Sequence, residues 1–226
     1  MRTRGAWLAA VGLVAVVAAA GLFVTVRAGA DTDRCTGFRQ AAAARSALVT
    51  GTGRDVLVIG DSYSVGLGTS AADSWPTRLP GRVHVAGFSG SGFGAHSSEC
   101  GAVSYADRAP RALARDPGLV VVEGGLNDFD QSRAAIRAGF ADLLADLGHR
   151  RVLVVGPPPA PQRAGAVPAV DAELARLSRR YGVGYLSMQH ADLSYLDDGL
   201  HLTAEGHRQF GDLVAAALST ATRPGR

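Results

Sequence analysis

The residues with the clearest chemical potential are a serine, an aspartate and a histidine in two motifs that lie far apart in the sequence. Ser62 follows Gly60 and Asp61 directly after an apolar run. Asp198 and His201 lie three positions apart near the C-terminus. A serine hydroxyl attacks an acyl carbonyl when an imidazole accepts its proton and a carboxylate orients the imidazole. These residue types predict acyl transfer, with Ser62 as nucleophile, His201 as general base and Asp198 as its orienting acid.

Acyl transfer also needs hydrogen-bond donors for the negative charge that develops on the carbonyl oxygen. The segment 87–94 reads GFSGSGFG, and its glycines allow backbone N–H groups to point into a site. Asn127 is the only asparagine of the chain, and it lies in the segment 123–128, which reads EGGLND. Both segments follow predicted strands, so both are candidate sources of these donors.

Simpler roles are available for the same residues when each is taken alone. Asp61 or Ser62 could cap a helix after the strand, and Asn127 could be a turn residue. His190 and Asp192 form a rival acid–base pair, but they lack the Asp-x-x-His spacing. The other histidines have no partner pattern and are expected to be surface or structural residues: His84, His96, His149 and His207.

These motifs stand at the ends of short apolar segments that alternate with amphipathic ones. The short apolar runs predict five strands, over residues 56–59, 82–86, 119–123, 151–155 and 184–187. Apolar residues spaced three and four apart predict helices within 136–147, 167–181 and 210–218, and a shorter helix is expected over 75–79. This alternation predicts a parallel sheet covered by helices on both faces. The ends of its strands lie side by side, which would bring the motifs together.

The N-terminal segment has the features of an export signal. Arg2 and Arg4 precede an uncharged, largely apolar run over residues 5–26, and about 20 such residues span a bilayer. Residues 28–30 read AGA and resemble a signal-peptidase site, so a retained signal anchor and a cleaved signal peptide both fit residues 1–30. Either one places the rest of the chain outside the cytoplasm, with membrane contact expected only through this segment.

The remaining residues are expected to form one domain with flanking segments. Residues 31–53 read as a linker with one short helix around 38–48, residues 54–222 as the domain, and residues 223–226 as a tail. A chain of 226 residues that is 47% hydrophobic can bury one core of this size.

Composition argues against several kinds of partner. The formal net charge of +3 is partly terminal and no basic stripe with interleaved aromatic residues appears, so nucleic acid is not an expected partner. The two cysteines lack the spacing of a zinc site, and neither a metal nor a cofactor is expected. In an oxidising compartment Cys35 and Cys100 are expected to form a disulfide.

Four short blocks, taken in order, resemble those of the SGNH or GDSL hydrolases. They are Gly-Asp-Ser at 60–62, Gly90 in the second loop, Gly-Leu-Asn-Asp at 125–128 and Asp-Gly-Leu-His at 198–201. The resemblance extends over about residues 54–222. It implies a three-layer α/β/α sandwich with a flavodoxin-like, mostly parallel five-stranded sheet, and an exported serine esterase without a cofactor.

The resemblance also implies roles by position. Ser62 is similar to the nucleophile of the family, and Asp198 and His201 are similar to its acid and base. The backbone N–H groups of Ser62 and Gly90 and the side-chain amide of Asn127 match the three donors of its oxyanion hole.

The second block departs from the family pattern. Many members have an asparagine at its start, where this chain has Val85 or Ala86. Gly87, Gly92 and Gly94 therefore remain alternatives to Gly90 as the second donor.

The loops that would surround the site predict a small, polar substrate. They contain few large apolar residues, namely Phe88, Phe93, Phe129 and Tyr195. A long acyl chain would need more apolar lining than this. The proline-rich loop 156–168 and the side chains of Gln189, His190 and Ser194 offer a polar rim instead. We therefore predict an esterase for short-chain acyl groups, with O-deacetylation of extracellular or envelope carbohydrate as the specific hypothesis.

Three other functions fit parts of the sequence. The first is a lysophospholipase or thioesterase that an N-terminal anchor would keep beside lipids. The second is a nucleotide-binding module, based on the glycines of residues 87–94, but the polar run over 96–101 does not open the helix that such a module needs. The third is a catalytically silent binding domain, which the complete set of five catalytic positions argues against.

Overall fold

The computed structural model describes residues 31–221. The predicted signal or anchor over 1–30 and the predicted tail over 223–226 lie outside the described residues. The chain divides into two compact units, residues 1–37 and 38–226, and the fold is that of the second unit. The helix expected around 38–48 is present as part of a helix over residues 31–47, and residues 38–53 belong to the second unit. Within 31–221, no helix combines the length and the apolar character that crossing a membrane would require.

Five strands form one parallel sheet with the order β2-β1-β3-β4-β5. The strands are β1 (Asp55–Gly60), β2 (Arg82–Gly87), β3 (Leu119–Glu123), β4 (Arg151–Val155) and β5 (Gly184–Leu186). All five lie within about a residue of the predicted strands, because runs of Val, Leu and Ile can be buried on both faces of a parallel sheet. The predicted flavodoxin-like α/β/α architecture is confirmed.

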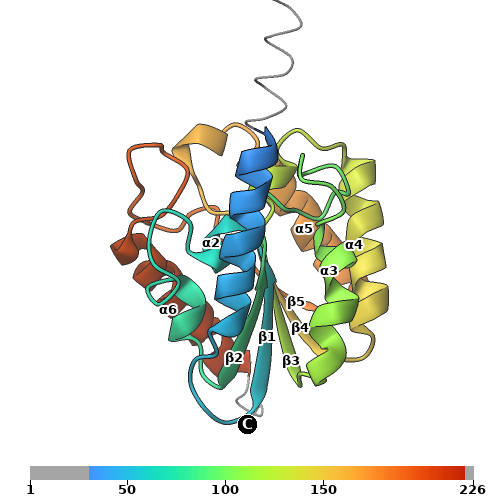
Figure 1. Ribbon diagram of the computed structural model, residues 1–226. Helices are drawn as coiled ribbons and strands as arrows, with labels where there is room; N and C mark the ends of the chain where they lie inside the picture. The colour runs from blue at the N-terminus through green and yellow to red at the C-terminus, as the bar shows by residue number, and fades with distance from the viewer. Residues whose placement is uncertain (1–30, 222–226) are drawn as a thin grey trace, which may run out of the picture. The chain divides into compact units, whose positions relative to one another are not determined.

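Helices cover both faces of the sheet (Figure 1). The helices are α2 (Ser62–Val65), α3 (Tyr105–Ala112), α4 (Arg133–Leu147), α5 (Val167–Tyr181) and α6 (Ala204–Ala221). Short 3-10 turns complete the set, with η1 (Trp75–Arg78), η2 (Leu113–Arg115), η3 (Leu126–Asp128) and η4 (Pro161–Arg163). One core joins the sheet to α6 and η1, and the other joins it to α3, α4 and α5.

The predicted apolar stripes form these cores with two exceptions. The five stripe residues of α4 are all buried, whereas Tyr181 of α5 and Leu213 of α6 remain 42% and 43% exposed. The buried apolar residues of α6 are Phe210, Val214 and Leu218, which are spaced four apart. Leu213 lies outside this row and therefore remains exposed.

Helix α3 was not predicted from the sequence. Its interior contains Pro110 and its segment is short and charged, which hides the helical pattern. Its start is nevertheless well marked, because Ser104 and Asp107 form a reciprocal capping box.

Both cysteines of the chain are disulfide-bonded, so the predicted Cys35–Cys100 disulfide is present in the structure.

The strand order places the ends of β1 and β3 at a topological switch point. From β1 the chain first crosses to β2 on one side and later continues in β3 on the other side. Ligand sites of open α/β sheets form at the carboxyl ends of strands at such a point. Ser62 follows β1 with only Asp61 between them, and Asn127 follows β3 after a short turn.

Candidate active site

The candidate nucleophile stands in a tight turn between β1 and α2. Ser62 is the first residue of α2 and is 7% exposed. Asp61 caps the helix, because its Oδ1 accepts a hydrogen bond of 2.9 Å from the Tyr63 N–H. A Cβ at Gly60 would lie 2.0 Å from Ser64 Oγ, so only glycine fits where the turn closes on itself. Of the two capping candidates in the sequence, Asp61 is therefore the residue that caps the helix.

Asp198 and His201 form a hydrogen-bonded pair. His201 Nδ1 lies 2.6 Å from Asp198 Oδ2, and Asp198 Oδ1 accepts bonds of 2.9 Å from the N–H groups of Leu200 and His201. Partial burial raises the pKa of the Asp198 carboxyl, but the bonds from His201 and the backbone outweigh it and lower that pKa to about 2. The carboxylate therefore holds Nδ1 as the donor and leaves Nε2 as the basic nitrogen.

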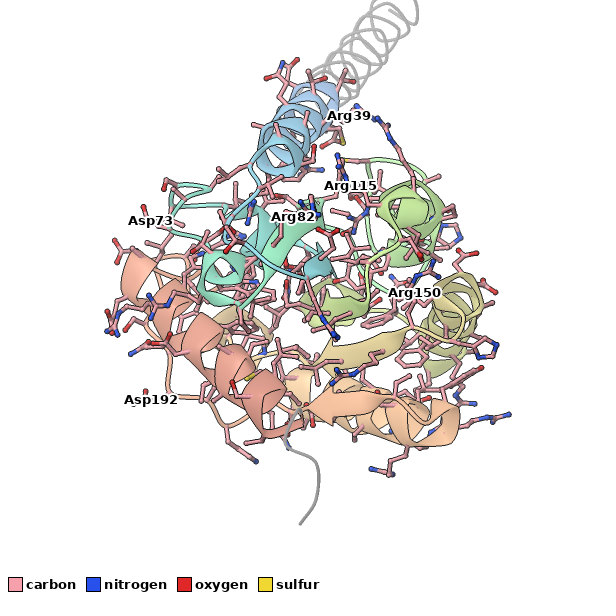
Figure 2. All side chains as sticks on the ribbon, turned by 90° about the horizontal axis from the view of Figure 1, so that it is seen from below. Arg39, Asp73, Arg82, Arg115, Arg150 and Asp192 are labelled. Carbon is pink, nitrogen blue, oxygen red and sulfur yellow. The ribbon has the colours of Figure 1, made fainter. Side chains whose placement is uncertain are left out.

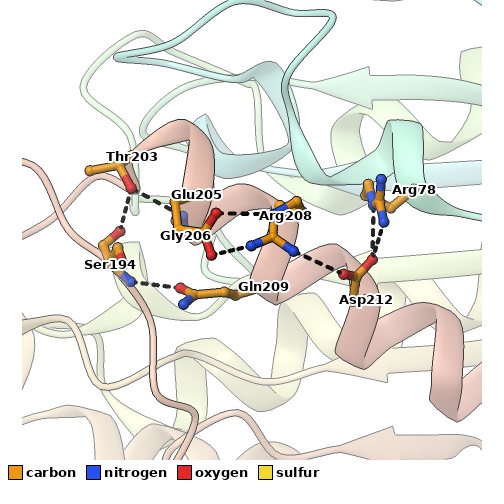
Figure 3. A network of polar contacts seen from close by, with 8 residues as sticks. All are labelled: Arg78, Ser194, Thr203, Glu205, Gly206, Arg208, Gln209 and Asp212. Atoms are coloured by element: carbon orange, nitrogen blue, oxygen red, sulfur yellow. Dashed lines mark hydrogen bonds and ion pairs between the residues drawn. The ribbon is translucent and has the colours of Figure 1, made fainter.

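A polar network fixes the loop that carries this pair (Figure 3). Ser194 accepts bonds at its carbonyl from the N–H and the Oγ1 of Thr203, and its N–H donates to Gln209 Oε1 over 2.9 Å. Thr203 Oγ1 in turn accepts from the Gly206 N–H over 3.0 Å. Both ends of the loop over residues 194–203 are thus tied to the start of α6, which limits the movement of His201.

Tyr63 connects the Asp198–His201 loop to the nucleophile turn. Its hydroxyl donates a hydrogen bond of 2.5 Å to the carbonyl oxygen of Leu200, the residue before His201. Burial raises the pKa of the Tyr63 hydroxyl, so it remains a donor at neutral pH. Tyr63 follows Ser62, and Leu200 precedes His201. This hydrogen bond therefore joins the segment that carries the candidate nucleophile to the segment that carries the candidate base.

The second loop supplies a turn that contains Gly90. The Ser91 N–H donates to the Phe88 carbonyl over 3.1 Å, and Gly90 has φ of +82°, which favours glycine. Within the described residues, the backbone N–H groups of Ser62 and Gly90 have no acceptor. Both groups are therefore available to an oxygen bound in the site.

The alternatives to Gly90 are poorer donors for an anion. The Gly94 N–H already donates to Asp128 Oδ1 over 2.8 Å. A Cβ at Gly92 would lie 2.6 Å from the Asp128 carboxyl group, so the backbone here is packed against that buried acid. Gly87 is the last residue of β2 and is packed against Val65. The geometry therefore favours Gly90.

Asn127 joins the two turns. Its Nδ2 donates to the Ser91 carbonyl over 2.9 Å and to Asp61 Oδ2 over 3.1 Å. The side-chain amide of this residue thus lies between the nucleophile turn and the Gly90 turn, as an oxyanion donor would. The structure brings Ser62, Gly90 and Asn127 together on one side and joins Asp198 to His201 on the other.

Three carboxyl groups are buried beneath the turns: Asp61, Glu123 and Asp128 are each at most 1% exposed. Asp128 accepts bonds from the N–H groups of Phe93 and Gly94 and from Ser97 Oγ, so it holds the second loop in shape. Burial raises the pKa of Asp128 in spite of these donors.

Glu123 supports the nucleophile helix from below. Its Oε2 accepts a bond of 2.6 Å from Ser64 Oγ. Burial raises the pKa of Glu123 to about 7, partly offset by the bond from Ser64. Burial, and then repulsion from Glu123, raises the pKa of Asp61 well above its usual value. The pair therefore does not carry two full charges at neutral pH.

Arg108 was missed in the sequence analysis together with α3. Its half-buried side chain donates to the carbonyls of Gly60, Ala86 and Val103 and to Ser91 Oγ. This side chain links the ends of β1 and β2 to the Gly90 turn. The capping box of α3 was the one sequence signal that could have placed it.

Other groups weighed from the sequence do not join the site. His190 and Asp192 are both exposed, and no hydrogen bond connects them in the part of the chain that is described. His207 is fully buried, and burial lowers the pKa of its imidazole to about 4, so it is a neutral core residue. Across residues 31–221, no cluster of three or more His, Cys, Asp or Glu side chains could hold a metal ion.

Comparisons with known proteins identify the family and the fold. The model of the GDSL-like lipase/acylhydrolase family matches residues 58–209. No curated protein matches the chain. The fold and the site define an α/β ester hydrolase. Because the family model covers more than half of the sequence, the chain belongs to the GDSL-like lipase/acylhydrolase family.

Several solved structures share the fold. The carbohydrate acetylesterase Est24 from Sinorhizobium meliloti has a TM-score of 0.63 and 20% identity, over 75% of this chain and 100% of that one. An aryl esterase from M. smegmatis has a TM-score of 0.64 and 19% identity, over 74% and 99%. A family two carbohydrate esterase from Clostridium thermocellum has a TM-score of 0.59 and 16% identity, over 76% and 65%.

Glu123 makes the stability of the fold depend on pH. The usual pKa of its carboxyl is 4.5 and the folded value is about 7, so the folded chain keeps a proton that the unfolded chain has released. Its contribution therefore lowers the free energy of unfolding as the pH rises from about 4.5 to about 7. Glu123→Gln, which keeps an acceptor for Ser64, should make this decline shallower in urea unfolding curves. The exposed control Glu205→Gln should retain the wild-type slope, and equal slopes in all three proteins would contradict the assignment.

Proposed function

We propose that this ester hydrolase cleaves short-chain acyl esters through an acyl-enzyme intermediate on Ser62. The observation that carries the proposal is the Asp198–His201 pair, whose loop is hydrogen-bonded to Tyr63, the residue next to Ser62. This arrangement supplies a nucleophile, a base and an orienting acid from two segments in contact.

In the first half of the reaction, Ser62 Oγ attacks the ester carbonyl and His201 Nε2 takes the hydroxyl proton. Asp198 stabilises the imidazolium that forms, since it already accepts a bond from Nδ1. The tetrahedral intermediate collapses when His201 returns the proton to the leaving alcohol, which leaves the acyl group on Ser62. In the second half, His201 activates a water molecule that attacks the acyl carbonyl and restores the serine.

The oxyanion of each tetrahedral intermediate would be bound by the N–H groups of Ser62 and Gly90 and by the Asn127 amide. The two backbone donors have no acceptor of their own in the described chain. Asn127 has two acceptors, and the bond of 3.1 Å to Asp61 is the longer. An oxyanion would take over that bond, and the raised pKa of Asp61 means that a neutral carboxyl can be left behind.

The rim of the site supports a small acyl group. Phe88 and Phe93 are 4% and 0% exposed, so these residues belong to the core and offer no lining for an acyl chain. Phe129 remains 41% exposed, and the guanidinium of Arg163 lies 3.6 Å from the centre of its ring. An exposed ring beside a cation suits a polar alcohol portion better than a long alkyl chain.

A carbohydrate ester is the substrate class that we favour. The similar structures include a carbohydrate acetylesterase and a family two carbohydrate esterase, although at 20% and 16% identity they establish only the fold. The disulfide supports a location outside the cytoplasm, where extracellular or envelope carbohydrate would be met. Lysophospholipase or thioesterase activity is the alternative that long-chain substrates would reveal.

Replacing Asn127 by alanine tests the oxyanion donor. Because the amide acts on charge present chiefly in the transition state, kcat for an aryl acetate should fall by about 10²–10³ with little change in KM. Gln131→Ala, which removes an exposed amide four residues later, is the matched control and should retain activity. A folded Asn127→Ala variant in which only KM rises would contradict the role.

Acyl-chain length separates the proposed substrate class from its alternative. With one leaving group, kcat/KM should be higher for the acetyl ester than for the dodecanoyl ester by at least about tenfold, because the rim offers little apolar area. Release of acetate from a peracetylated sugar, absent in Ser62→Ala, should accompany this preference. Faster turnover of the dodecanoyl ester would overturn the carbohydrate assignment and favour the lipid or thioester substrates.

A further inference from the structure

A cavity distinct from the candidate catalytic residues lies beside the edge strand β2. It has a volume of about 570 Å³ and is formed by helical residues 39–46, the edge strand β2 and the segment from α3 into η2. Ser62, Asn127 and His201 are not among its lining residues. We call it the arginine groove, after the cationic side chains that line it: Arg39, Arg108, Arg111 and Arg115.

Small residues create the space in this groove. The helix contributes Ala42, Ala43 and Ser46, and β2 contributes Ala86 and Gly87. Because none of these side chains is long enough to fill the gap between the two elements, a cavity remains instead of a packed contact. Ligand pockets usually measure about 300–1,000 Å³, so the groove is large enough for a small organic molecule.

The charge of the groove is strongly positive. Asp107 is its one acidic lining residue, and that carboxylate is already bonded to the N–H and the hydroxyl of Ser104. Arg108 contributes charge from the floor, although carbonyl and hydroxyl acceptors occupy its N–H groups. Arg39 gives one bond of 3.3 Å to the Cys100 carbonyl.

Arg111 and Arg115 have no acceptor of their own. Within residues 31–221 neither side chain takes part in a hydrogen bond or an ion pair, and both are exposed. They lie four residues apart, so like charges face the same groove and repel each other. A helix C-terminus favours one cation nearby, but it does not explain why Arg39 from another helix lines the same cavity.

A smaller cavity continues the positive surface towards the start of β2. Besides Val49, it is lined by Asp55, Arg82, His84 and Arg115, and the acid is again occupied, since Asp55 pairs with Arg82 and His84. Figure 2 shows Arg39, Arg115 and Arg82 in one region of the molecule. The positive charge therefore extends beyond Arg111 and Arg115 to the neighbouring arginines Arg39 and Arg82.

We propose that the arginine groove binds a phosphate-class anion on a small organic body, through Arg111 and Arg115. The planar guanidinium matches the oxygens of a phosphate with two parallel hydrogen bonds. An anion between the two side chains would remove their repulsion, and the space left by Ala42, Ala43 and Ala86 would accommodate the body of the ligand. Such a group could belong to a free phosphomonoester or to the headgroup of an anionic phospholipid.

The first arm of the test uses glycerol phosphate and isothermal titration calorimetry on the full chain. The wild type should bind it, and Arg111→Gln/Arg115→Gln should raise the Kd by at least about tenfold. Arg133→Gln/Arg151→Gln removes the same formal charge from exposed positions outside the groove and should leave the Kd unchanged. This result would assign the groove to a free phosphomonoester.

The second arm uses vesicles, with phosphatidylglycerol compared with phosphatidylcholine. Excess binding to phosphatidylglycerol that is lost only in Arg111→Gln/Arg115→Gln, without binding of glycerol phosphate, would assign the groove to a lipid headgroup. The comparison of the two lipids cancels any binding that the apolar N-terminal segment causes by itself. No anion-dependent binding in either arm, or an equal loss in both double variants, would overturn the proposal.

Discussion

The hydrogen bonds of the Arg108 guanidinium are the interaction on which the site depends most. This group donates to the carbonyl of Gly60, at the end of the strand before the nucleophile, and to Ser91 Oγ, beside the candidate oxyanion donor Gly90. One side chain thus fixes two turns that come from different strands. Its positive charge opposes the rise in the Asp61 pKa only weakly, because burial and then Glu123 raise that pKa well above its usual value. Without this side chain the two turns would lose the hydrogen bonds that join them.

The buried acids beneath the two turns bear on how the proposed site would bind the negative charge of an oxyanion. Asn127 connects the two turns through its hydrogen bonds to Ser91 and Asp61. Asp61 and Glu123 are both buried. Because burial favours the neutral form of these acids, a bond from Asn127 can be transferred from Asp61 to an oxyanion without stranding a full negative charge. The burial of these acids therefore supports the proposed role of Asn127 in binding an oxyanion.

Much of this structure was predictable from local patterns. Continuous runs of Val, Leu and Ile located all five strands, and the spacing of Asp198 and His201 predicted a pair that the structure shows at 2.6 Å. Arg108 was not predictable in the same way, because its role depends on contacts with carbonyls that are distant in the sequence. Pro110 also concealed the helix that carries it. Likewise, Phe88 and Phe93 were expected at the site, but tertiary packing buries both in the core.

Labelling with a fluorophosphonate tests the central claim that Ser62 is a nucleophile activated by His201. The account predicts one adduct per chain by intact mass, mapped to Ser62 by peptide sequencing, and much slower labelling in His201→Ala. The exposed control His190→Ala should be labelled at the wild-type rate. A folded protein that forms no adduct, or an adduct on any residue other than Ser62, would contradict the account.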